Sequence, residues 1–408
     1  MLQPTLPSVE TGRSWRVAFV TLVIMTFAFG GVWINTVALK DIAAEVGGAR
    51  SIPAFASAMA WLCAGAGGIV MGRVAHRVGT RWTVIGGSVS ILIGLFISTY
   101  GPPWPLWIGH GVFIGLFGLG GINAPLYVYV SRWFDRRRGS ALALISSGSY
   151  LAGAMWPPIF ERAIELVGWR ETMLIFGAVE LCVVVPLAAA VLSAPPEMPE
   201  PLTGGAARVR AGRVMGWPPN VVFGALCFAS ILCCLTMSMP QQHLVAFCSD
   251  LGYSRTFGAL TLSVLLGTAF VSRQVWGAIA DRIGGLGTVV IGSAWQASAM
   301  TAFLFTQDQA SLITVSAAFG LGFSGIIPAY VLALRELYPA SEAHWRIPTL
   351  LMFTAIGMGG GGWLAGILYD HFGYYTPAFA AGVLSNLLNL SIVATLFVRA
   401  LTMRRAAA

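Results

Sequence analysis

The sequence predicts an all-α membrane protein in which twelve transmembrane helices form two pseudo-symmetric six-helix bundles. Three observations support this fold class: the composition, the length of the apolar runs, and an internal repeat. The 408 residues have a mean hydropathy of +0.77, and only 10% of them are charged. A soluble domain usually carries about 25% charged residues. A surface so poor in charge suits lipid better than water.

The apolar runs have the length of transmembrane helices. About 20 apolar residues cross a hydrocarbon core of about 30 Å as a helix. Backbone groups in lipid must bond internally, and long uninterrupted runs favour helices over the alternating strands of a barrel. We predict spans at residues 16–39, 52–72, 82–100, 105–130, 140–164, 170–193, 218–247, 256–278, 287–306, 309–337, 346–369 and 375–400.

A polar segment divides these spans into two sets of six. Residues 194–217 are rich in Pro, Gly and Arg and have no apolar period. Such a composition is typical of a linker. We therefore predict an N-terminal bundle at 1–193, a cytoplasmic linker at 194–217 and a C-terminal bundle at 218–408.

The two sets repeat one another at an offset of 205 residues. In the loop after the second span, Gly72, Arg77 and Gly79 each match a residue of the loop after the eighth span. The same offset takes Trp133-Phe134 to Tyr338-Pro339. Because two different loops agree on one offset, the repeat indicates parallel halves, a design that places a substrate site between them.

The basic residues are distributed unevenly between the two sides of the predicted membrane. If both termini are cytoplasmic, the outer segments contain only Lys40, Arg50, Arg162, Arg170 and Arg255, and Arg273 lies within a span. This positive-inside pattern explains the net charge of +8 without nucleic acid. The first span is too long for a secretory signal and lacks a clear small-residue cleavage site. We expect a multi-pass protein with cytoplasmic termini, and the short loops favour a bacterial inner membrane.

The two repeated loops resemble the signature of the major facilitator superfamily, a Gly-x-x-x-Asp-Arg-x-Gly-x-Arg motif. The positions that match are Gly72, Arg77, Gly79 and Arg81 in the first copy, and Gly277, Asp281, Arg282 and Gly284 in the second. The resemblance implies the major facilitator fold, with a central cavity that opens alternately to each side and loops that latch the outward-facing state. His76 stands where an aspartate is usual, which would weaken the first latch.

The loop between the fourth and fifth spans resembles a narrower group. Its sequence from Arg132 to Ala141 has an aromatic pair, then basic residues and Gly-x-Ala. This order is similar to that of the monocarboxylate transporter and oxalate–formate antiporter branch. The alternative is a generic positive-inside loop anchored by an interfacial tryptophan.

The same resemblance implies that Arg273 binds the carboxylate of the substrate, because it lies one helical turn before Gly277. Ala269 occupies the position of an aspartate that often relays protons in this branch. A second basic residue in the eleventh span, typical of dicarboxylate antiporters, is also absent. These departures favour a substrate with one carboxylate and leave proton symport and anion exchange both open.

Physical chemistry independently marks Arg273 as a candidate anion-binding residue. An arginine within the hydrocarbon region costs about 2.5–3.5 kcal/mol on insertion scales and normally faces a cavity or a partner. Its planar fork of donors suits a carboxylate. The alternative is that the side chain, about 9 Å from the middle of its span at 1.5 Å per residue, reaches the interface and binds no substrate.

Other polar and aromatic side chains are candidates for the same cavity. They lie near Pro125, Pro240 and Pro328, where irregular helices can surround a midplane site. These candidates are Asn123, Tyr127, Gln242, His243 and Tyr330. Ordinary hydrogen bonding between helices is the alternative for each. A histidine within the membrane can also hold a proton or donate to a carboxylate.

No constellation for catalysis or cofactor binding is evident. The run Gly359–Gly362 lacks the lysine and the flanking strand of a phosphate loop, and close helix packing explains it better. We therefore predict a secondary active transporter without cofactor or metal, and not an enzyme. The favoured substrate is a small organic anion, a monocarboxylate, moved with a proton or in exchange for another anion. The alternative is an efflux transporter for a drug or other hydrophobic compound, although cation exporters generally need a cavity carboxylate.

Overall fold

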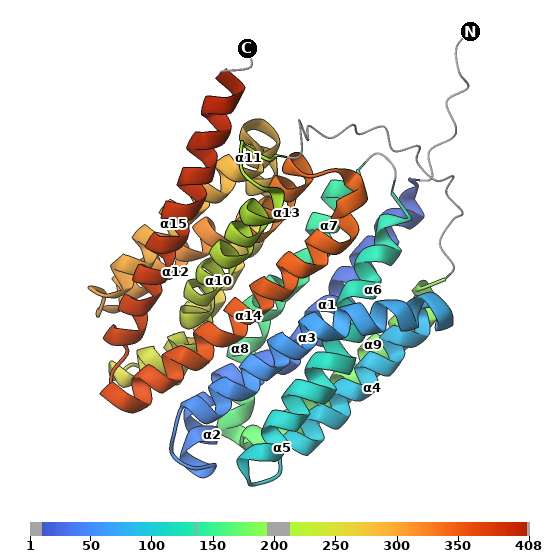
Figure 1. The fold of residues 1–408 in the computed structure, drawn as a ribbon. Coiled ribbons are helices and arrows are strands. Elements are labelled where there is room, and N and C mark those ends of the chain that lie inside the picture. The colour runs from blue at the N-terminus through green and yellow to red at the C-terminus, as the bar shows by residue number, and fades with distance from the viewer. Residues whose placement is uncertain (1–9, 135–136, 194–212, 406–408) are drawn as a thin grey trace.

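The computed structural model describes residues 10–134, 137–193 and 213–405. Most of the predicted linker, residues 194–212, lies outside this part, as do Asp135 and Arg136 of the loop between the fourth and fifth spans. The described residues are almost entirely helical. Figure 1 shows the helices running roughly side by side along the long direction of the molecule.

The first half of the chain contains α1 (Gly12–Val37), α2 (Leu39–Glu45), α3 (Ser51–Val78), α4 (Thr80–Ser98), α5 (Pro103–Ile108), the π-helix η1 (Gly109–Leu119), α6 (Gly120–Ser131), α7 (Arg138–Ser146), α8 (Gly148–Val167) and α9 (Trp169–Val191). The second half contains α10 (Pro219–Asp250), α11 (Arg255–Phe303), α12 (Gln309–Phe323), α13 (Ile326–Leu337), α14 (Ala340–Phe372) and α15 (Thr376–Arg405).

These elements form the twelve predicted spans. Within the described residues, ten helical stretches are long and apolar enough to cross a membrane. One of them, α11, has 49 residues and is two spans joined at Gly284, whose φ of 78° interrupts the helix. The remaining span is α7–α8, whose last turns carry Glu161, Arg162 and Glu165. The predicted twelve-helix fold is therefore confirmed.

The two halves lie next to each other, and α1 begins at the same end of the molecule at which α15 ends (Figure 1). We call this the terminal end and the other the far end. At the terminal end, α3 turns into α4 at Gly79, and the two parts of α11 meet at Gly284. These glycines have φ values of +90° and +78°, which residues with a side chain rarely adopt. The offset of 205 residues between them, predicted from the sequence, is thus also a repeat of backbone geometry.

Glycines allow the helices within each half to approach closely. A methyl group on Gly115 of η1 would lie 2.6 Å from the carbonyl oxygen of Ala60 in α3, and one on Gly94 of α4 would lie 2.7 Å from that of Gly109. Both distances are too short for a real contact. Small residues at such crossings are typical of helix packing in membranes, where van der Waals contact replaces the hydrophobic effect between helices.

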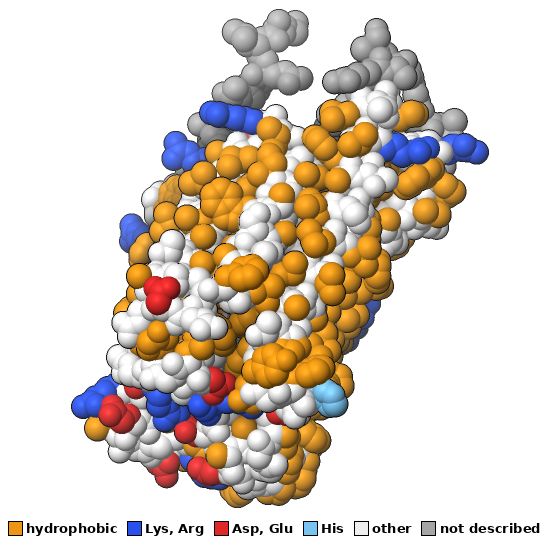
Figure 2. Space-filling view, turned by 90° about the vertical axis from the view of Figure 1, so that its left-hand side faces the viewer, with side chains coloured by type: hydrophobic (Ala, Val, Ile, Leu, Met, Phe, Trp, Pro, Cys, Tyr) orange, Lys and Arg blue, Asp and Glu red, His pale blue; other side chains and the backbone are white. Residues whose placement is uncertain are grey.

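The outer surface has the character expected of a protein in lipid. Figure 2 shows apolar side chains over the middle of the face in view, basic side chains at the terminal end, and a mixture of acidic and basic side chains at the far end. Large apolar residues such as Val271 and Leu384 are 64% and 69% exposed. In water such a surface would aggregate, whereas hydrocarbon solvates it.

Candidate functional site

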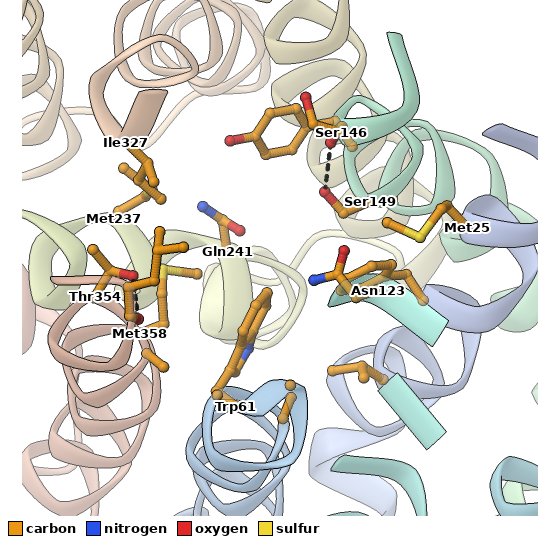
Figure 3. Close-up of a pocket in the computed structure, with 18 of the residues that line it drawn as sticks. Met25, Trp61, Asn123, Ser146, Ser149, Met237, Gln241, Ile327, Thr354 and Met358 are labelled. Atoms are coloured by element: carbon orange, nitrogen blue, oxygen red, sulfur yellow. Dashed lines mark hydrogen bonds between the residues drawn. The ribbon is translucent and has the colours of Figure 1, made fainter. Parts of the chain in front are cut away.

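A cavity of about 280 Å³ lies between the two halves. Helices α1, α3, α6, α7 and α8 of the first half line it, together with α10, α11, α13 and α14 of the second. Large apolar and aromatic side chains form most of the wall, namely Met25, Phe29, Trp33, Trp61, Tyr127, Tyr150, Met237, Ile327, Leu351 and Met358. Several of them surround the open space in Figure 3.

Arg273 is the one charged side chain among the described residues that line this cavity. It lies on α11, and its guanidinium carbon is 5.1 Å from the centre of the Tyr150 ring, a distance typical of a cation–π contact. In the described part of the chain, no carboxylate lies within ion-pair distance of it. The cavity therefore carries one positive charge whose close partner is an aromatic ring.

Buried polar atoms without partners surround the same space. Across the described structure, Trp33 Nε1, Asn123 Oδ1, Gln241 Nε2 and Gln242 Oε1 are buried and have no hydrogen-bond partner, and all four residues line the cavity. Figure 3 shows the amides of Asn123 and Gln241 pointing into it from opposite sides. Because an unpaired buried polar group costs about 1–3 kcal/mol, these atoms are suited to a polar ligand or ordered water.

Four of the six predicted binding residues come together in this cavity: Arg273, Asn123, Tyr127 and Gln242. Asn123 and Tyr127 lie four residues apart on α6 and face the same side, as the helical spacing predicts. Gln242 also donates from Nε2 to the carbonyl oxygen of Met358, at 3.3 Å.

His243 and Tyr330 do not line the cavity. The His243 ring is fully buried, with Nε2 2.8 Å from the carbonyl oxygen of Gly362 and Nδ1 2.9 Å from the Tyr375 hydroxyl. Because a carbonyl can only accept, Nε2 carries the proton. The Tyr330 hydroxyl donates to Asn389 Oδ1 at 2.6 Å, inside the second half. Both side chains have complete partners within the protein.

The residues that sequence reasoning missed in the cavity wall include Trp33, Trp61, Tyr150 and Gln241. Gln241 directly precedes the predicted residue Gln242, and its polar side chain within a span is a signal that could have found it. The aromatic residues lie in spans that are apolar on every side, so their sequence carries no signal that distinguishes a cavity wall from a lipid-facing or core position.

At the far end, ion pairs join the two halves. Arg50, which precedes α3, donates from Nη1 and Nη2 to the two carboxylate oxygens of Asp250 in α10, at 2.6 and 2.7 Å. Lys40 Nζ lies 3.0 Å from the same carboxylate. Burial opposes the charge of Arg50, but hydrogen bonds with Asp250 and Tyr375 outweigh it and raise the pKa of the guanidinium above its usual value. The pair is thus ionised at any physiological pH.

Further contacts cross between the halves beside this pair. The Asp370 carboxylate of α14 accepts from the backbone N–H groups of Arg50 and Ser51 at the start of α3, at 2.8 and 2.9 Å. Arg255 forms an ion pair with Asp41, and the Thr256 hydroxyl donates to Glu161 at 3.1 Å. We call these contacts the far-end seam: Lys40, Asp41, Arg50, Ser51, Glu161, Asp250, Arg255, Thr256 and Asp370.

Helices α3 and α14 continue the closure towards the cavity. A methyl group on Gly359 would lie 2.8 Å from the carbonyl oxygen of Ala58, so the predicted role of the Gly359–Gly362 run in close packing is confirmed here. Between the cavity and the terminal end, α3 is no longer covered by the other half: Val70, Val74 and Val78 are 48%, 37% and 51% exposed. The halves are therefore in contact at the far end and separate towards the terminal end.

The predicted gating motif lies at the terminal end and makes few contacts. Side chains on Gly72, Gly79 and Gly277 would meet nothing within 4 Å. Arg77, Asp281 and Arg282 are exposed and have no ion pair or hydrogen bond within the described residues. Arg81 Nε donates to the carbonyl oxygen of Leu192 at 2.9 Å. No contact between the halves involves the motif in this conformation of the described chain.

Two six-helix repeats with a cavity between them, sealed by paired charges at one end, define a membrane transporter rather than an enzyme. In the described residues, no group of three or more His, Cys, Asp or Glu side chains could hold a metal ion. The family model described as Major Facilitator Superfamily matches residues 21–285, and the chain belongs to this superfamily. It is an integral, multi-pass membrane protein.

Comparisons with individual proteins agree with this family. The MFS-type transporter pynF of Aspergillus niger is 25% identical over 381 residues, which cover 91% of this chain and 85% of that protein. Monocarboxylate transporter 13 of Rattus norvegicus is 23% identical over 314 residues, covering 74% of this chain and 70% of that one.

Solved structures show the same fold at low identity. A bacterial homolog of the human lysosomal transporter Spinster superposes with a TM-score of 0.69 at 15% identity, covering 96% of this chain and 97% of that one. The peptide transporter POT gives a TM-score of 0.72 at 14% identity, covering 93% and 94%.

Proposed function

We propose that this transporter moves a small organic anion, a monocarboxylate, by alternating access, and that Arg273 binds its carboxylate. The observation that carries the proposal is the single positive charge of the cavity, which has no carboxylate partner among the described residues. A guanidinium can hold a carboxylate by two parallel hydrogen bonds. Because one cation faces the cavity, one negative charge on the ligand neutralises it.

The rest of the wall suits the organic part of such a molecule. The apolar side chains Phe29, Trp61 and Met358 surround the space, and the unpaired amide atoms of Asn123 and Gln241 can bind a polar substituent. A cavity of about 280 Å³ lies just below the range of about 300–1,000 Å³ that is typical of ligand sites. These features support a compact substrate.

The far-end seam and the separated terminal end support an inward-facing state, with the terminal end cytoplasmic. This orientation follows the positive-inside distribution of basic residues. We propose that the two motif loops, from Gly72 to Arg81 and from Gly277 to Gly284, form their latch in the outward-facing state. The expected bacterial inner membrane stays a prediction, and the two relatives compared above are fungal and mammalian.

The source of energy is a coupled proton or an exchanged anion. No acidic side chain belongs to the described lining of the cavity, and Ala269 replaces the aspartate expected one turn before Arg273. A coupled proton would therefore be carried by the substrate or by a group outside the cavity. The transport experiment below separates the two mechanisms.

Efflux of a drug or other hydrophobic compound is the second candidate. The specific observation in its favour is the aromatic and methionine-rich wall, because such side chains adapt to varied apolar ligands. Arg273 argues against a cationic compound, since the cavity offers it no counter-charge among the residues described.

The test is uptake of radiolabelled lactate, pyruvate and oxalate into proteoliposomes, with and without an inward proton gradient. We expect Arg273→Ala to lower the uptake of a monocarboxylate about 100-fold, because truncating one partner of a buried charge pair costs about 2–5 kcal/mol. Arg335→Gln is the matched control, since Arg335 is exposed at the end of α13 and outside the cavity.

Stimulation by the proton gradient would indicate symport, and stimulation by anion preloaded in the vesicles would indicate exchange. Wild-type uptake by Arg273→Ala would overturn the site assignment. Transport of a hydrophobic dye, with none of the three acids transported by folded protein, would favour efflux.

A further inference from the structure

The repeated turns at Gly79 and Gly284 each begin a transmembrane helix. In the first half, α4 starts at Thr80 directly after Gly79. In the second half, the second part of α11 starts at Gly285 directly after Gly284. The two glycines have similar backbone angles, with ψ values of 149° and 171°. These two helix N-termini are therefore equivalent positions of the repeat, and their surroundings can be compared directly.

In the second half a carboxylate occupies the helix N-terminus. The backbone N–H of Gly285 lies 3.2 Å from both Oε1 and Oε2 of Glu336, the penultimate residue of α13. A methyl group on Gly284 would lie 3.2 Å from the same oxygens. The first N–H groups of a helix have no partner inside the helix and attract negative charge. The protein thus supplies its own anion at this position.

Among the residues that the structure describes, no side-chain anion occupies the same position in the first half. Ser131 lies 205 residues before Glu336, and its hydroxyl donates to the carbonyl oxygen of Val128 at 2.7 Å. No side chain caps the start of α4. A methyl group on Gly79 would meet nothing within 4 Å. The carboxylate of the second half is replaced by open space in the first.

This open space is a cavity of about 660 Å³ with a basic lining. Its wall includes Arg81 and Arg132 as well as His76, and no acidic side chain among the described residues. Arg81 donates from Nε to Leu192, which leaves its two terminal nitrogens available. Arg132 is exposed and makes no ion pair in the described part of the chain. The start of α4 and two guanidinium groups therefore surround one volume.

The basic groups nearby reinforce this charge. Arg73 and Arg77 follow on the exposed last turns of α3. Arg13 of α1 donates to the Ser193 hydroxyl at the wall, at 3.0 Å. The Glu10 carboxylate, an acidic group near this region, lies 3.9 Å from Arg137 Nε. The described neighbouring elements thus add positive charge to the cavity, and none of their carboxylates belongs to its lining.

We propose that this cavity is a binding site for a phosphate group, and that the phosphate takes the position that the Glu336 carboxylate holds in the second half. Tetrahedral phosphate oxygens can accept from the first N–H groups of α4 and from both arginines, the donor set that helix N-termini and arginines offer to phosphates elsewhere. The site is separate from Arg273 and independent of the proposed substrate.

An anionic phospholipid is the source that the surroundings favour. Trp82 and Val128 line the cavity and are 65% and 58% exposed, so apolar side chains extend from the phosphate position along the lipid-facing surface. A tryptophan at this depth is typical of the membrane interface. Acyl chains can lie against these side chains while the headgroup reaches α4. Inorganic phosphate shares the chemistry of the headgroup, but it has no acyl chains to contact the apolar side chains of this wall.

The experiment measures the affinity of the purified full-length protein in detergent for three probes: short-chain phosphatidic acid, short-chain phosphatidylcholine and inorganic phosphate. Ser131→Glu is the main variant, because it places a carboxylate at the position equivalent to Glu336. We expect it to abolish phosphatidic acid binding. Arg81→Gln and Arg132→Gln should each weaken binding about tenfold, as expected for one charge-assisted contact. Arg335→Gln removes the same charge from the second half and is the control.

Binding of phosphatidic acid that depends on Arg81, Arg132 and Ser131, with weak binding of the other two probes, would support the lipid site. Equal, arginine-dependent binding of inorganic phosphate would support the phosphate site and assign it to a soluble ligand. The proposal is overturned if the two arginine variants bind phosphatidic acid as tightly as Arg335→Gln. This outcome does not depend on whether Ser131→Glu folds.

Discussion

The interface between the two halves uses its charges in opposite ways at its two ends. At the far end, Arg50 and Asp250 hold each other across the halves by two short hydrogen bonds. At the terminal end, Asp281 and Arg282 belong to the family motif but have no partner among the described residues. The difference indicates that the contacts that stabilise this conformation are concentrated at the far end, and it agrees with the proposal that the motif forms its latch in the outward-facing state.

The comparison also explains how a rocking motion can be reversible. Opening the far end separates several partly buried charges, which costs free energy. In the proposed outward-facing state, the motif charges would gain new partners at the terminal end, and these contacts would offset part of that free energy. A transporter needs the two states to differ by only a few kcal/mol, since otherwise one state would be too rare to take part in the cycle.

The largest expected effect comes from Asp250→Asn, which removes the carboxylate shared by Arg50 and Lys40. The side chains of Arg50 and Asp250 are only 10% and 23% exposed, so we expect the far-end seam to lose about 1.5–3 kcal/mol, the range of hydrogen bonds to charged groups. The population should shift towards a state open at the far end. Spin labels at Tyr100 and Phe305, in a background without native cysteines, would report this shift as longer distances between the halves.

Asp308→Asn is the matched control for this prediction. Asp308 is also acidic and at the far end, but its carboxylate binds Ser311 within the second half. It should leave the distances between the halves unchanged. If Asp250→Asn gave the same distances as Asp308→Asn, the far-end seam would not be what holds this conformation.

A smaller shift in the same direction is expected from Gly359→Ala. Its new methyl group would lie 2.8 Å from the carbonyl oxygen of Ala58, and overpacking of this kind costs about 1–3 kcal/mol. At the neighbouring Gly360 a methyl group would meet nothing within 4 Å. Gly360→Ala should therefore behave as wild type in the same distance measurement. Equal behaviour of the two variants would show that α3 and α14 are not in contact at this point.

The smallest effect on the stability of this state is expected from Asp281→Asn at the terminal end. Because the Asp281 side chain is exposed and has no partner here, its loss should change the free energy of unfolding by less than about 0.5 kcal/mol. Transport should nevertheless slow if the motif closes the other state. Thermal unfolding and uptake rate would be measured on the same preparation. A fall in unfolding temperature as large as that of Asp250→Asn would contradict the comparison.

The twelve spans were predictable because apolar length is a direct physical requirement of the bilayer. Gly79 and Gly284 were predictable as equivalent turns because a positive φ restricts the residue type. Arg273 was predictable as a cavity residue because an arginine within a span needs a polar environment. In each case one physical constraint acts on the residue itself, and no knowledge of its neighbours is needed.

The remaining parts of the site depend on how the helices are rotated. Gln241 and His243 are two residues apart on α10, and therefore on nearly opposite faces. Gln241 faces the cavity, whereas His243 faces Gly362 and Tyr375. Since apolar residues occur on every side of α10, its sequence does not indicate which face lines the cavity. The charged residues of the far-end seam lie at the ends of helices far apart in the sequence. Their pairing therefore depends on how the two halves pack and cannot be predicted from the sequence alone.

The single uncompensated charge of the cavity also gives the two proposed mechanisms different responses to the membrane potential. In the proposed orientation, the empty carrier exposes Arg273 to the negative cytoplasmic side, which stabilises the conformation seen here. In anion exchange, a bound monocarboxylate would cancel this charge in both directions, so the loaded carrier would cross the electric field as a neutral complex. In proton symport, the carrier would return empty against the field, at a cost of up to about 2.3 kcal/mol per 100 mV for a full charge. A resting potential would therefore slow the return step of symport and leave exchange unaffected.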